Sequence, residues 1–265
     1  MPRYRDLTLT PVRQDAVQLS QINEAIWFDD QLIMTAITSN LQAVNHAITQ
    51  ATCMAGRRKG SVELLAVSKN FSAIAVREAY QAGQRAFGES YIQEALDKIE
   101  KLRDLPIQWH FIGPVQSNKT RAIATHFAWV HSVDRLKIAE RLSAQRPATL
   151  PPLNVCIQVN VSGEDSKSGV VPGELVELAQ AVACLPHLKL CGLMAVPAPA
   201  EGLEAQRISF FKLHELMQQI NTQGLALDTL SMGMSHDLSA AILEGATIVR
   251  VGTAIFGERN YGENQ

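Results

Sequence analysis

Apolar positions along the chain follow two alternating patterns. From residue 62 onward, short apolar runs are each followed by a stretch in which apolar residues recur every three or four positions. The first pattern is typical of buried strands and the second of amphipathic helices. Eight strands are predicted, at residues 62–68, 85–89, 107–113, 128–133, 153–161, 188–196, 227–233 and 247–257.

Helices are predicted between these strands, at residues 72–82, 91–103, 117–127, 134–145, 172–185, 204–222 and 237–245. Residues that favour the N-cap position stand at several expected starts: Ser72, Ser117, Asp134 and Ser235. Glycines suited to a left-handed helix end stand at three expected ends: Gly83, Gly224 and Gly245.

Strands that alternate with helices in this way predict an α/β protein, in which a parallel sheet closes into a TIM-type (β/α)8 barrel. A doubly wound open sheet is the alternative. That fold usually has fewer strands and a glycine fingerprint after the first one, whereas here the first strand runs into the sequence SKNFSA. We therefore predict a single barrel domain.

An extra helix is predicted ahead of the barrel, over residues 35–56. Its apolar positions, such as Ile37, Leu41 and Val44, recur at steps of three and four. Residues 1–33 show no sustained periodicity. We assign the barrel domain to residues 34–265 and interpret residues 1–33 as a poorly ordered extension or the product of a misassigned start, with Met34 as the alternative first residue.

Composition narrows the class of partner. Of 265 residues 46% are hydrophobic, and the formal net charge is −2 with lysine and arginine spread along the chain. We therefore expect no nucleic-acid partner. No apolar run is long enough to span a bilayer, and the N-terminus lacks the apolar segment of a secretory signal, so we expect a cytoplasmic protein without a membrane partner.

Cysteine and histidine spacing indicates no metal site. The four cysteines form no CxxC pair and the seven histidines form no HExxH motif. In a reducing compartment the cysteines act as small apolar residues.

The first strand ends in a lysine, within the sequence ELLAVSKN at residues 63–70. Strand alternation places Leu65, Val67 and Lys69 on one face, and the carboxyl ends of barrel strands carry active sites. If Leu65 and Val67 fill the barrel, Lys69 points along its axis, where desolvation lowers the pKa of the amine. A neutral amine forms Schiff bases with carbonyls. A lysine that extends into water is the alternative.

Two glycine-bearing segments follow the last two strands, where barrels of this type often bind phosphate. The first, SMGMSHD at residues 231–237, contains Gly233, which allows close backbone approach, and Ser235, which offers a hydroxyl near a helix start. The second contains Gly252 and Thr253, an uncrowded amide and a hydroxyl. Together with Lys69 they predict a ligand that carries both a carbonyl and a phosphate. A capped helix and a glycine bend are the alternative.

Polar residues interrupt two of the predicted strands. Arg250 lies within the apolar sequence TIVRVGTAIF and either reaches a carboxylate on the helix side or points inward at a ligand. In the fifth strand, Gln158 and Asn160 share the face predicted to line the barrel, where amides need partners. A packed polar layer is the simplest interpretation of the two amides.

Seven segments of the sequence together resemble one family. They are LLAVSK, the FGE–Tyr–Gln-Glu pattern of residues 87–94, WHFIGPVQSNK, NVSGEDSKSG, GLMAV, SMGMSHD and VRVGTAIFG. Spread over about residues 34–261, they are similar to the YggS/PROSC family of pyridoxal 5′-phosphate (PLP) homeostasis proteins. The segment WHFIGPVQSNK, at residues 109–119, is highly specific.

The resemblance implies a barrel like the N-terminal domain of bacterial alanine racemase, with PLP held as a Schiff base on Lys69. It implies that Ser235, Gly252 and Thr253 hold the phosphate and that Arg250 lies near the pyridine nitrogen. An arginine at that nitrogen keeps it unprotonated, so the ring is a poor electron sink.

Two further residues complete the predicted cofactor site: His110, from WHFIGPVQSNK, and Met234, from SMGMSHD. One position departs from the family pattern. Ser90 follows FGE where the family usually has asparagine. Because the side chain of serine is shorter, the resemblance does not imply a contact between residue 90 and the cofactor.

Three functions are compatible with such a site. The first is a carrier that buffers PLP or delivers it to apo PLP-dependent enzymes, without strong catalytic turnover. The second is an amino-acid racemase, but alanine racemase adds a β-domain and a tyrosine from the partner subunit, for which Tyr261 is a poor substitute. The third is a Schiff-base aldolase, which needs an acid or base beside Lys69, where His110 is interpreted as single and unpaired.

We favour the carrier. We expect a monomer, because the racemase's second domain, its main dimer contact, has no counterpart after the eighth strand. The loop SGEDSKSG, at residues 162–169, carries Lys167 near the barrel rim. We interpret Lys167 either as a solvated loop lysine or as a transient second docking point for PLP.

Overall fold

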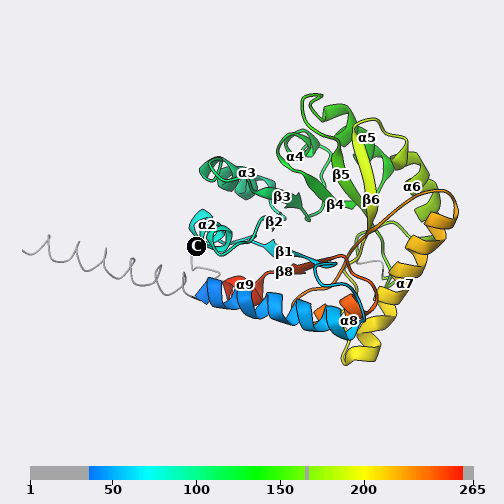
Figure 1. The fold of residues 1–265 in the computed structure, drawn as a ribbon. Coiled ribbons are helices and arrows are strands. Elements are labelled where there is room, and N and C mark those ends of the chain that lie inside the picture. Colours follow the sequence, from blue (N-terminus) through cyan, green and yellow to red (C-terminus); the bar gives the residue numbers. More distant parts are fainter. Residues whose placement is uncertain (1–35, 165–166, 259–265) are drawn as a thin grey trace, which may run out of the picture.

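The alternating apolar runs form the strands of a closed parallel barrel (Figure 1). The structure is a computed structural model that describes residues 36–164 and 167–258. Each strand pairs with its neighbours in sequence, and β8 pairs with β1, so the predicted TIM-type fold is confirmed. The strands are β1 (Glu63–Val67), β2 (Ala86–Glu89), β3 (Gln108–Phe111), β4 (Trp129–Val133), β5 (Leu153–Gln158), β6 (Leu188–Met194), β7 (Thr229–Ser231) and β8 (Ile248–Val251).

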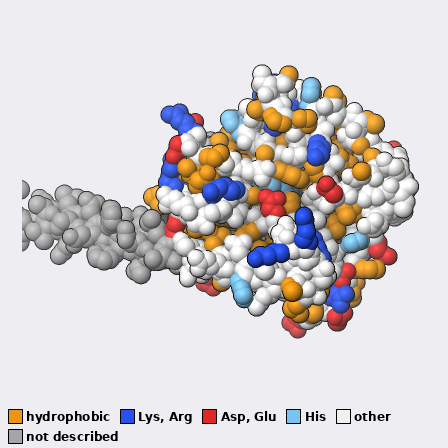
Figure 2. Space-filling view, viewed as in Figure 1, with side chains coloured by type: hydrophobic (Ala, Val, Ile, Leu, Met, Phe, Trp, Pro, Cys, Tyr) orange, Lys and Arg blue, Asp and Glu red, His pale blue; other side chains and the backbone are white. Residues whose placement is uncertain are grey.

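Helices connect the strands and surround the barrel (Figure 1). They are α2 (Ala73–Gln81), α3 (Ile92–Lys101), α4 (Thr120–His126), α5 (Leu136–Gln145), α6 (Leu175–Ala183) after the 3-10 turn η1 (Pro172–Glu174), α7 (Leu203–Thr222), α8 (Leu238–Leu243) and α9 (Thr253–Phe256). Among the described residues, none of the helices combines the length and the apolar character that a membrane span requires. Basic and acidic side chains are interspersed on the face of the molecule drawn in Figure 2.

The predicted extra helix is confirmed over residues 36–54, and it lies along α8 and α9 (Figure 1). The amide of Asn40 donates to the carbonyl oxygen of Ile255 at 3.0 Å. Arg57, just after the helix, donates to the carbonyl oxygens of Ile242 and Ala246 at 3.0 and 2.8 Å. These bonds attach the N-terminal helix and the residue that follows it to α8, to α9 and to the segment between α8 and β8. The assignment of residues 1–33 lies outside the described residues.

Helix ends follow the predictions only in part. Ser72 caps α2 by accepting a hydrogen bond from the amide of Ala75 at 3.2 Å, and Gly83, Gly224 and Gly245 have the expected positive φ.

The predictions for the three other N-caps are wrong, because each helix begins one or two residues later than the sequence pattern indicates. The observed cap positions are Lys119 for α4, Arg135 for α5 and Asp237 for α8.

The predicted eighth strand is too long. Residues 247–257 were expected to be extended, but β8 ends at Val251 and α9 follows directly. The amides of Ile255 and Phe256 donate to the carbonyl oxygen of Gly252, which closes a helical turn. Phe256 stacks against Phe71 with ring centroids 4.9 Å apart. A short apolar run fits a strand or a buried helical turn equally well, so periodicity alone does not separate them.

The prediction that Gln158 and Asn160 form a packed polar layer inside the barrel is also wrong. The amide of Gln158 donates to the carbonyl oxygen of Ser168, and that of Asn160 donates to the carbonyl oxygens of Glu164 and Lys167. These amides hold the segment that follows β5 instead of bonding across the barrel.

Apolar residues occupy only part of the barrel interior. The main core lies between the sheet and the helices, where burying each leucine or isoleucine contributes about 1.5–3 kcal/mol. Inside the barrel, a separate small cluster contains Leu65, Ala86 and Ile248, with Ile112 and Trp129 packed against it. The interior also holds a buried polar group made of His110, His131, Ser231 and Arg250.

Gly192 on β6 stands where β6 and β7 approach too closely for a side chain. A Cβ atom at this position would collide with the carbonyl oxygen of Thr229 on β7. We expect Gly192→Ala to lower the free energy of unfolding by about 1–3 kcal/mol, because overpacking forces the strands apart. Gly173→Ala is the control, since a Cβ there meets open space. Urea unfolding measures both, and wild-type stability of Gly192→Ala would contradict the close approach of β6 and β7.

Candidate functional site

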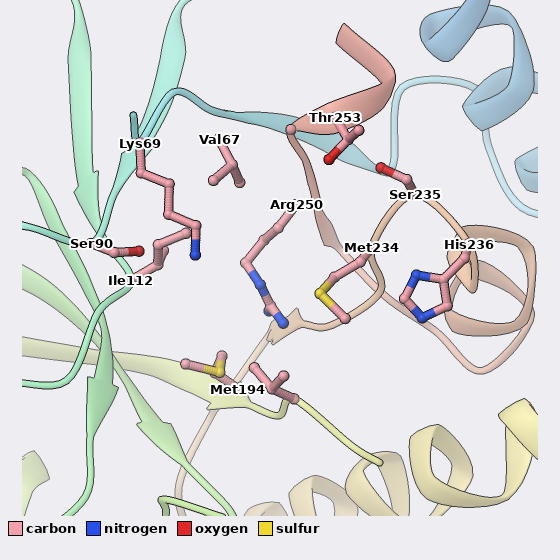
Figure 3. Close-up of a pocket in the computed structure, with 12 residues that line it drawn as sticks. Val67, Lys69, Ser90, Ile112, Met194, Met234, Ser235, His236, Arg250 and Thr253 are labelled. Atoms are coloured by element: carbon pink, nitrogen blue, oxygen red, sulfur yellow. The ribbon is translucent and has the colours of Figure 1, made fainter. Parts of the chain in front are cut away.

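A cavity of about 270 Å³ opens at the carboxyl ends of the strands (Figure 3). Six of the seven predicted site residues line it: Lys69, Met234, Ser235, Arg250, Gly252 and Thr253. They come from the turn after β1, the segment after β7, and β8 with its following turn. The barrel therefore brings together three segments that are far apart in sequence.

Lys69 enters the cavity from the turn after β1 (Figure 3). Its side chain is partly buried, and Val67, two residues earlier, lines the same cavity. The parity argument is confirmed, because Leu65 packs inside the barrel while Leu64 and Ala66 join the core outside it. A lysine directed wholly into solvent does not describe this geometry.

The hydroxyl groups of Ser235 and Thr253 lie close together on the side of the cavity across from Lys69 (Figure 3). The segment that carries Ser235 is held on both sides. Gly233 has a φ of 91° and accepts a hydrogen bond from the amide of Arg250 at 3.0 Å, while the carboxylate of Asp237 accepts one from the amide of Met234. Any Cβ on Gly233 would lie 2.5 Å from that of Ala241, so only glycine fits.

Arg250 points into the barrel and lines the cavity floor (Figure 3). Only 5% of the residue is exposed. Its guanidinium donates to the hydroxyl of Ser231 at 2.9 Å, to the carbonyl oxygen of Ser231 at 2.5 Å, and to that of Ala195 at 2.8 Å. Of the two orientations left open by the sequence, the structure has the inward one. Burial lowers its pKa to about 10, so Arg250 remains a cation at neutral pH.

His110 does not line the cavity. It is fully buried inside the barrel, where its Nδ1 lies 2.9 Å from Nε2 of His131. Nδ1 of His131 lies 2.7 Å from the hydroxyl of Ser231, which also accepts from Arg250. His110 therefore reaches the cavity only through this chain, and its interpretation as single and unpaired is wrong. Sequence spacing did not show the pairing, because the two histidines share an interior layer of neighbouring strands.

Both histidines are neutral at neutral pH. Burial lowers the pKa of His110 to about 3, and burial followed by the charges of its neighbours lowers that of His131 well below its usual value. The ring of His110 stacks on Trp129 with centroids 5.5 Å apart. Its Nε2 is buried and has no hydrogen-bond partner. The chain that supports Arg250 thus carries no charge of its own.

Several lining residues were not assigned to the site from the sequence. Apolar walls come from Ile112, Met194 and Val196, and His236 lies at the edge next to Ser235. Parity at the strand ends could have found Ile112, since it stands two residues after His110.

Ser90 also lines the cavity, so the departure from the family pattern falls within the site. Gly113 makes this placement feasible, because a Cβ there would collide with the carbonyl oxygen of Ser90. The glycine of WHFIGPVQSNK therefore brings the backbone of residue 90 to the cavity wall.

The fold and this site define a barrel that presents a lysine amine opposite two hydroxyls and a buried arginine. The model of the family described as the alanine racemase N-terminal domain matches residues 39–260, so the chain belongs to that family. Within the family it belongs to the pyridoxal phosphate homeostasis proteins. The resemblance inferred from the sequence motifs is therefore confirmed.

Particular relatives are closely similar. The chain is 62% identical over 229 residues to the pyridoxal phosphate homeostasis protein of Pseudomonas aeruginosa, covering 86% of this chain and 98% of that protein. It is 51% identical over 237 residues to that of Escherichia coli K12, covering 87% and 100%. The solved structure of PipY from Synechococcus elongatus with PLP bound has a TM-score of 0.73 and 36% identity, covering 83% of this chain and 100% of PipY.

We expect the neutral state of the buried histidines to make stability depend on pH. Unfolded histidines take up protons below about pH 6.5, whereas folded His110 does so only near pH 3, so the free energy of unfolding falls as the pH drops through this window. Between pH 7 and 5, wild type should lose about 2 kcal/mol more than His110→Phe, at about 1.4 kcal/mol per pH unit.

Urea unfolding at both pH values tests this difference. The test compares the two proteins because Glu78 also titrates in this window. Burial raises the pKa of Glu78 to about 7, so its protonation raises the free energy of unfolding as the pH drops, and it does so in both proteins. His110→Phe keeps a ring against Trp129 and loses one titrating group. Equal pH dependence of the two proteins would show that His110 takes up its proton while folded.

Proposed function

We propose that the protein binds PLP in this cavity, through a Schiff base between Lys69 and the aldehyde, and serves intracellular PLP homeostasis by buffering or delivering it. The observation that carries the proposal is the placement of the Lys69 amine across one cavity from the hydroxyls of Ser235 and Thr253. The names of the relatives and the PLP complex of PipY support it.

The residues present fit this cofactor. The volume, about 270 Å³, is close to the lower end of the range of about 300–1,000 Å³ for small-molecule sites, which suits a single-ring ligand. The apolar side chains of Ile112, Met194 and Met234 provide surfaces for a ring. Ser235, Gly252 and Thr253 would hold the phosphate through hydroxyls and an exposed backbone amide.

Arg250 favours binding over turnover. When bound, PLP supplies an aldehyde that bonds to an amine and a ring whose protonated form accepts electrons. We assign Arg250 to the ring nitrogen, as the family resemblance implies. A guanidinium with a pKa of about 10 donates a hydrogen bond but holds its own proton at neutral pH, so the ring nitrogen stays unprotonated. Catalysis that needs an electron-poor ring is then weakly supported.

Further parts of the proposal concern partners. Apo PLP-dependent enzymes would receive the cofactor, the protein would act as a monomer, and its location would be the cytoplasm. Lys167 follows the segment held by Asn160, whose amide bonds to the carbonyl oxygens of Glu164 and Lys167. Lys167 would act either as a transient docking point for departing PLP or as a solvated lysine.

Reduction with borohydride tests the bond to Lys69. Purified protein mixed with PLP should turn yellow, and borohydride should bleach the colour and leave the pyridoxyl group on the peptide that contains Lys69. Lys69→Met should weaken PLP binding at least about 100-fold, roughly 2.7 kcal/mol, while Lys101→Met on the exposed face of α3 should bind normally. A label on another lysine in the wild-type protein would refute the assignment.

An amino-acid racemase is the second candidate, because the family model is that of the alanine racemase N-terminal domain. Among the described residues that line the cavity there is no tyrosine to act as a second base. We therefore expect no exchange of the α-hydrogen of alanine for deuterium above the rate with free PLP. Proton NMR in heavy water measures this exchange, and rapid exchange that Lys69→Met abolishes would favour the racemase.

The aldolase is disfavoured by the place of His110. An aldolase needs a proton donor or acceptor beside Lys69, and His110 lies outside the cavity as a neutral, buried ring.

A further inference from the structure

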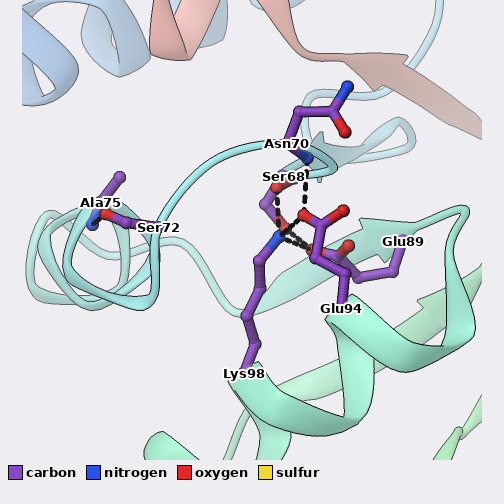
Figure 4. Close-up of polar contacts among 7 residues, drawn as sticks. All are labelled: Ser68, Asn70, Ser72, Ala75, Glu89, Glu94 and Lys98. Carbon is purple, nitrogen blue, oxygen red and sulfur yellow. Dashed lines mark hydrogen bonds and ion pairs between the residues drawn. The ribbon is translucent and has the colours of Figure 1, made fainter. Parts of the chain in front are cut away.

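The turn that carries Lys69 is held from outside the barrel by a buried ion cluster (Figure 4). At its centre is the ammonium group of Lys98, on α3. It donates to the carbonyl oxygen of Ser68 at 2.6 Å, to the carboxylate of Glu89 at 2.8 Å and to that of Glu94 at 2.6 Å. We call Glu89, Glu94 and Lys98 the Lys98 clamp.

The clamp contacts both chain neighbours of Lys69. The hydroxyl of Ser68 donates to the carboxylate of Glu89 at 2.6 Å, in addition to the bond from Lys98 to its carbonyl oxygen. The amide of Asn70 donates to the carboxylate of Glu94 at 2.6 Å (Figure 4). Residue 68 is thus tied to β2 and α3 and residue 70 to α3, while the side chain of Lys69 between them enters the cavity on the other side.

The backbone here has a conformation that needs such support. Asn70 has a φ of 67°, and among the described residues it alone has a positive φ without being glycine. Asparagine tolerates the left-handed region better than most residues, but the conformation still costs free energy. The bond from its amide to Glu94 stabilises this conformation, and with it the direction in which the chain leaves Lys69.

Stability alone does not account for the clamp. Lys98 is 4% exposed and Glu89 is fully buried, with one carboxylate oxygen that has no hydrogen-bond partner. Burial is the main influence on Glu89 and raises its pKa, against the opposing effect of Lys98. Desolvating such charges often costs as much as their attraction returns, and apolar residues of similar size are frequently as stable. The contacts of the clamp with residues 68 and 70 explain its presence better than a gain in stability does.

We propose that Glu89, Glu94 and Lys98 are positioning residues for Lys69, an inference that rests on the proposed bond between Lys69 and PLP. A lysine side chain has four rotatable bonds, so its amine samples a large volume unless the backbone that carries it is fixed. By holding residues 68 and 70, the clamp sets the direction of the Cα–Cβ bond of Lys69. The amine is then kept in the cavity, within reach of an aldehyde whose phosphate binds at the far side.

Two variants test the clamp. Glu94→Ala removes the acceptor for the amide of Asn70 and leaves the buried pair of Lys98 and Glu89 in place. The double variant Glu89→Gln with Lys98→Met removes both buried charges together, so neither is left buried without its partner. Glu94 loses its ion pair with Lys98, but it is partly exposed and keeps the bond from the amide of Asn70. Their controls change exposed residues of α3: Glu100→Ala for the first and Lys101→Met for the second.

The first readout uses the protein without PLP. Hydrogen exchange followed by NMR should show the amide of Asn70 exchanging at least about tenfold faster in Glu94→Ala than in wild type or Glu100→Ala. The second readout is the rate at which bound PLP transfers to an excess of an apo-enzyme trap. Both clamp variants should release PLP at least about tenfold faster than their controls, because a displaced amine raises the free energy of the bound state.

The outcomes separate this inference from the proposed function. If wild type itself gives no borohydride-stable label on Lys69, the proposed function fails. If wild type is labelled and both clamp variants, folded by circular dichroism, release PLP at the wild-type rate, only the positioning role is overturned. Unchanged exchange of the Asn70 amide in Glu94→Ala would also overturn it.

Discussion

The pairing of β8 with β1 is the constraint on which the site depends. Leu65 on β1 lies opposite Arg250 on β8, so the residues that follow each strand emerge side by side although they are far apart in sequence. Gly252 permits this approach, because a Cβ there would lie 3.1 Å from the carbonyl oxygen of Val67. Closure of the barrel therefore sets the distance between the Lys69 amine and the hydroxyls of Ser235 and Thr253, which no single segment could do.

Hydrogen bonds inside the barrel hold a buried cation, Arg250, beside the cavity. A buried guanidinium is costly unless its donors have partners, and Arg250 finds them in Ser231 and Ala195. Ser231 is in turn supported by His131 and His110, both neutral because they are buried. A neutral chain supports Arg250 without introducing a charge that would compete for it. The cation is thus held at one place on the wall of the cavity.

Much of this could be predicted from local patterns, and the failures share one cause. Strand parity predicted the direction of Lys69, and position after the last two strands predicted Ser235 and Thr253, because each inference needs only the local pattern and the order of the strands. The partner of His110 and the bonds of Asn160 depend on which residues of neighbouring strands and loops meet in space. Hydrophobic periodicity carries no information about such pairs. The helical turn of α9 was missed because four residues are too few to show a period.

In the proposed function, the features that would hold a cofactor differ from those that would transform one. A lysine amine and a phosphate cradle are enough for reversible covalent binding, and neither requires a group that moves a proton on a substrate. The buried arginine and the neutral histidines leave the floor of the cavity without an acid that titrates near neutral pH. The Lys98 clamp lies on the opposite side of the sheet, where Lys98 bonds to the backbone of the turn that carries Lys69 and does not line the cavity. In the proposed role, the charge of Lys98 helps to hold the Lys69 amine in position, as a carrier that must bind tightly and still release its cargo requires.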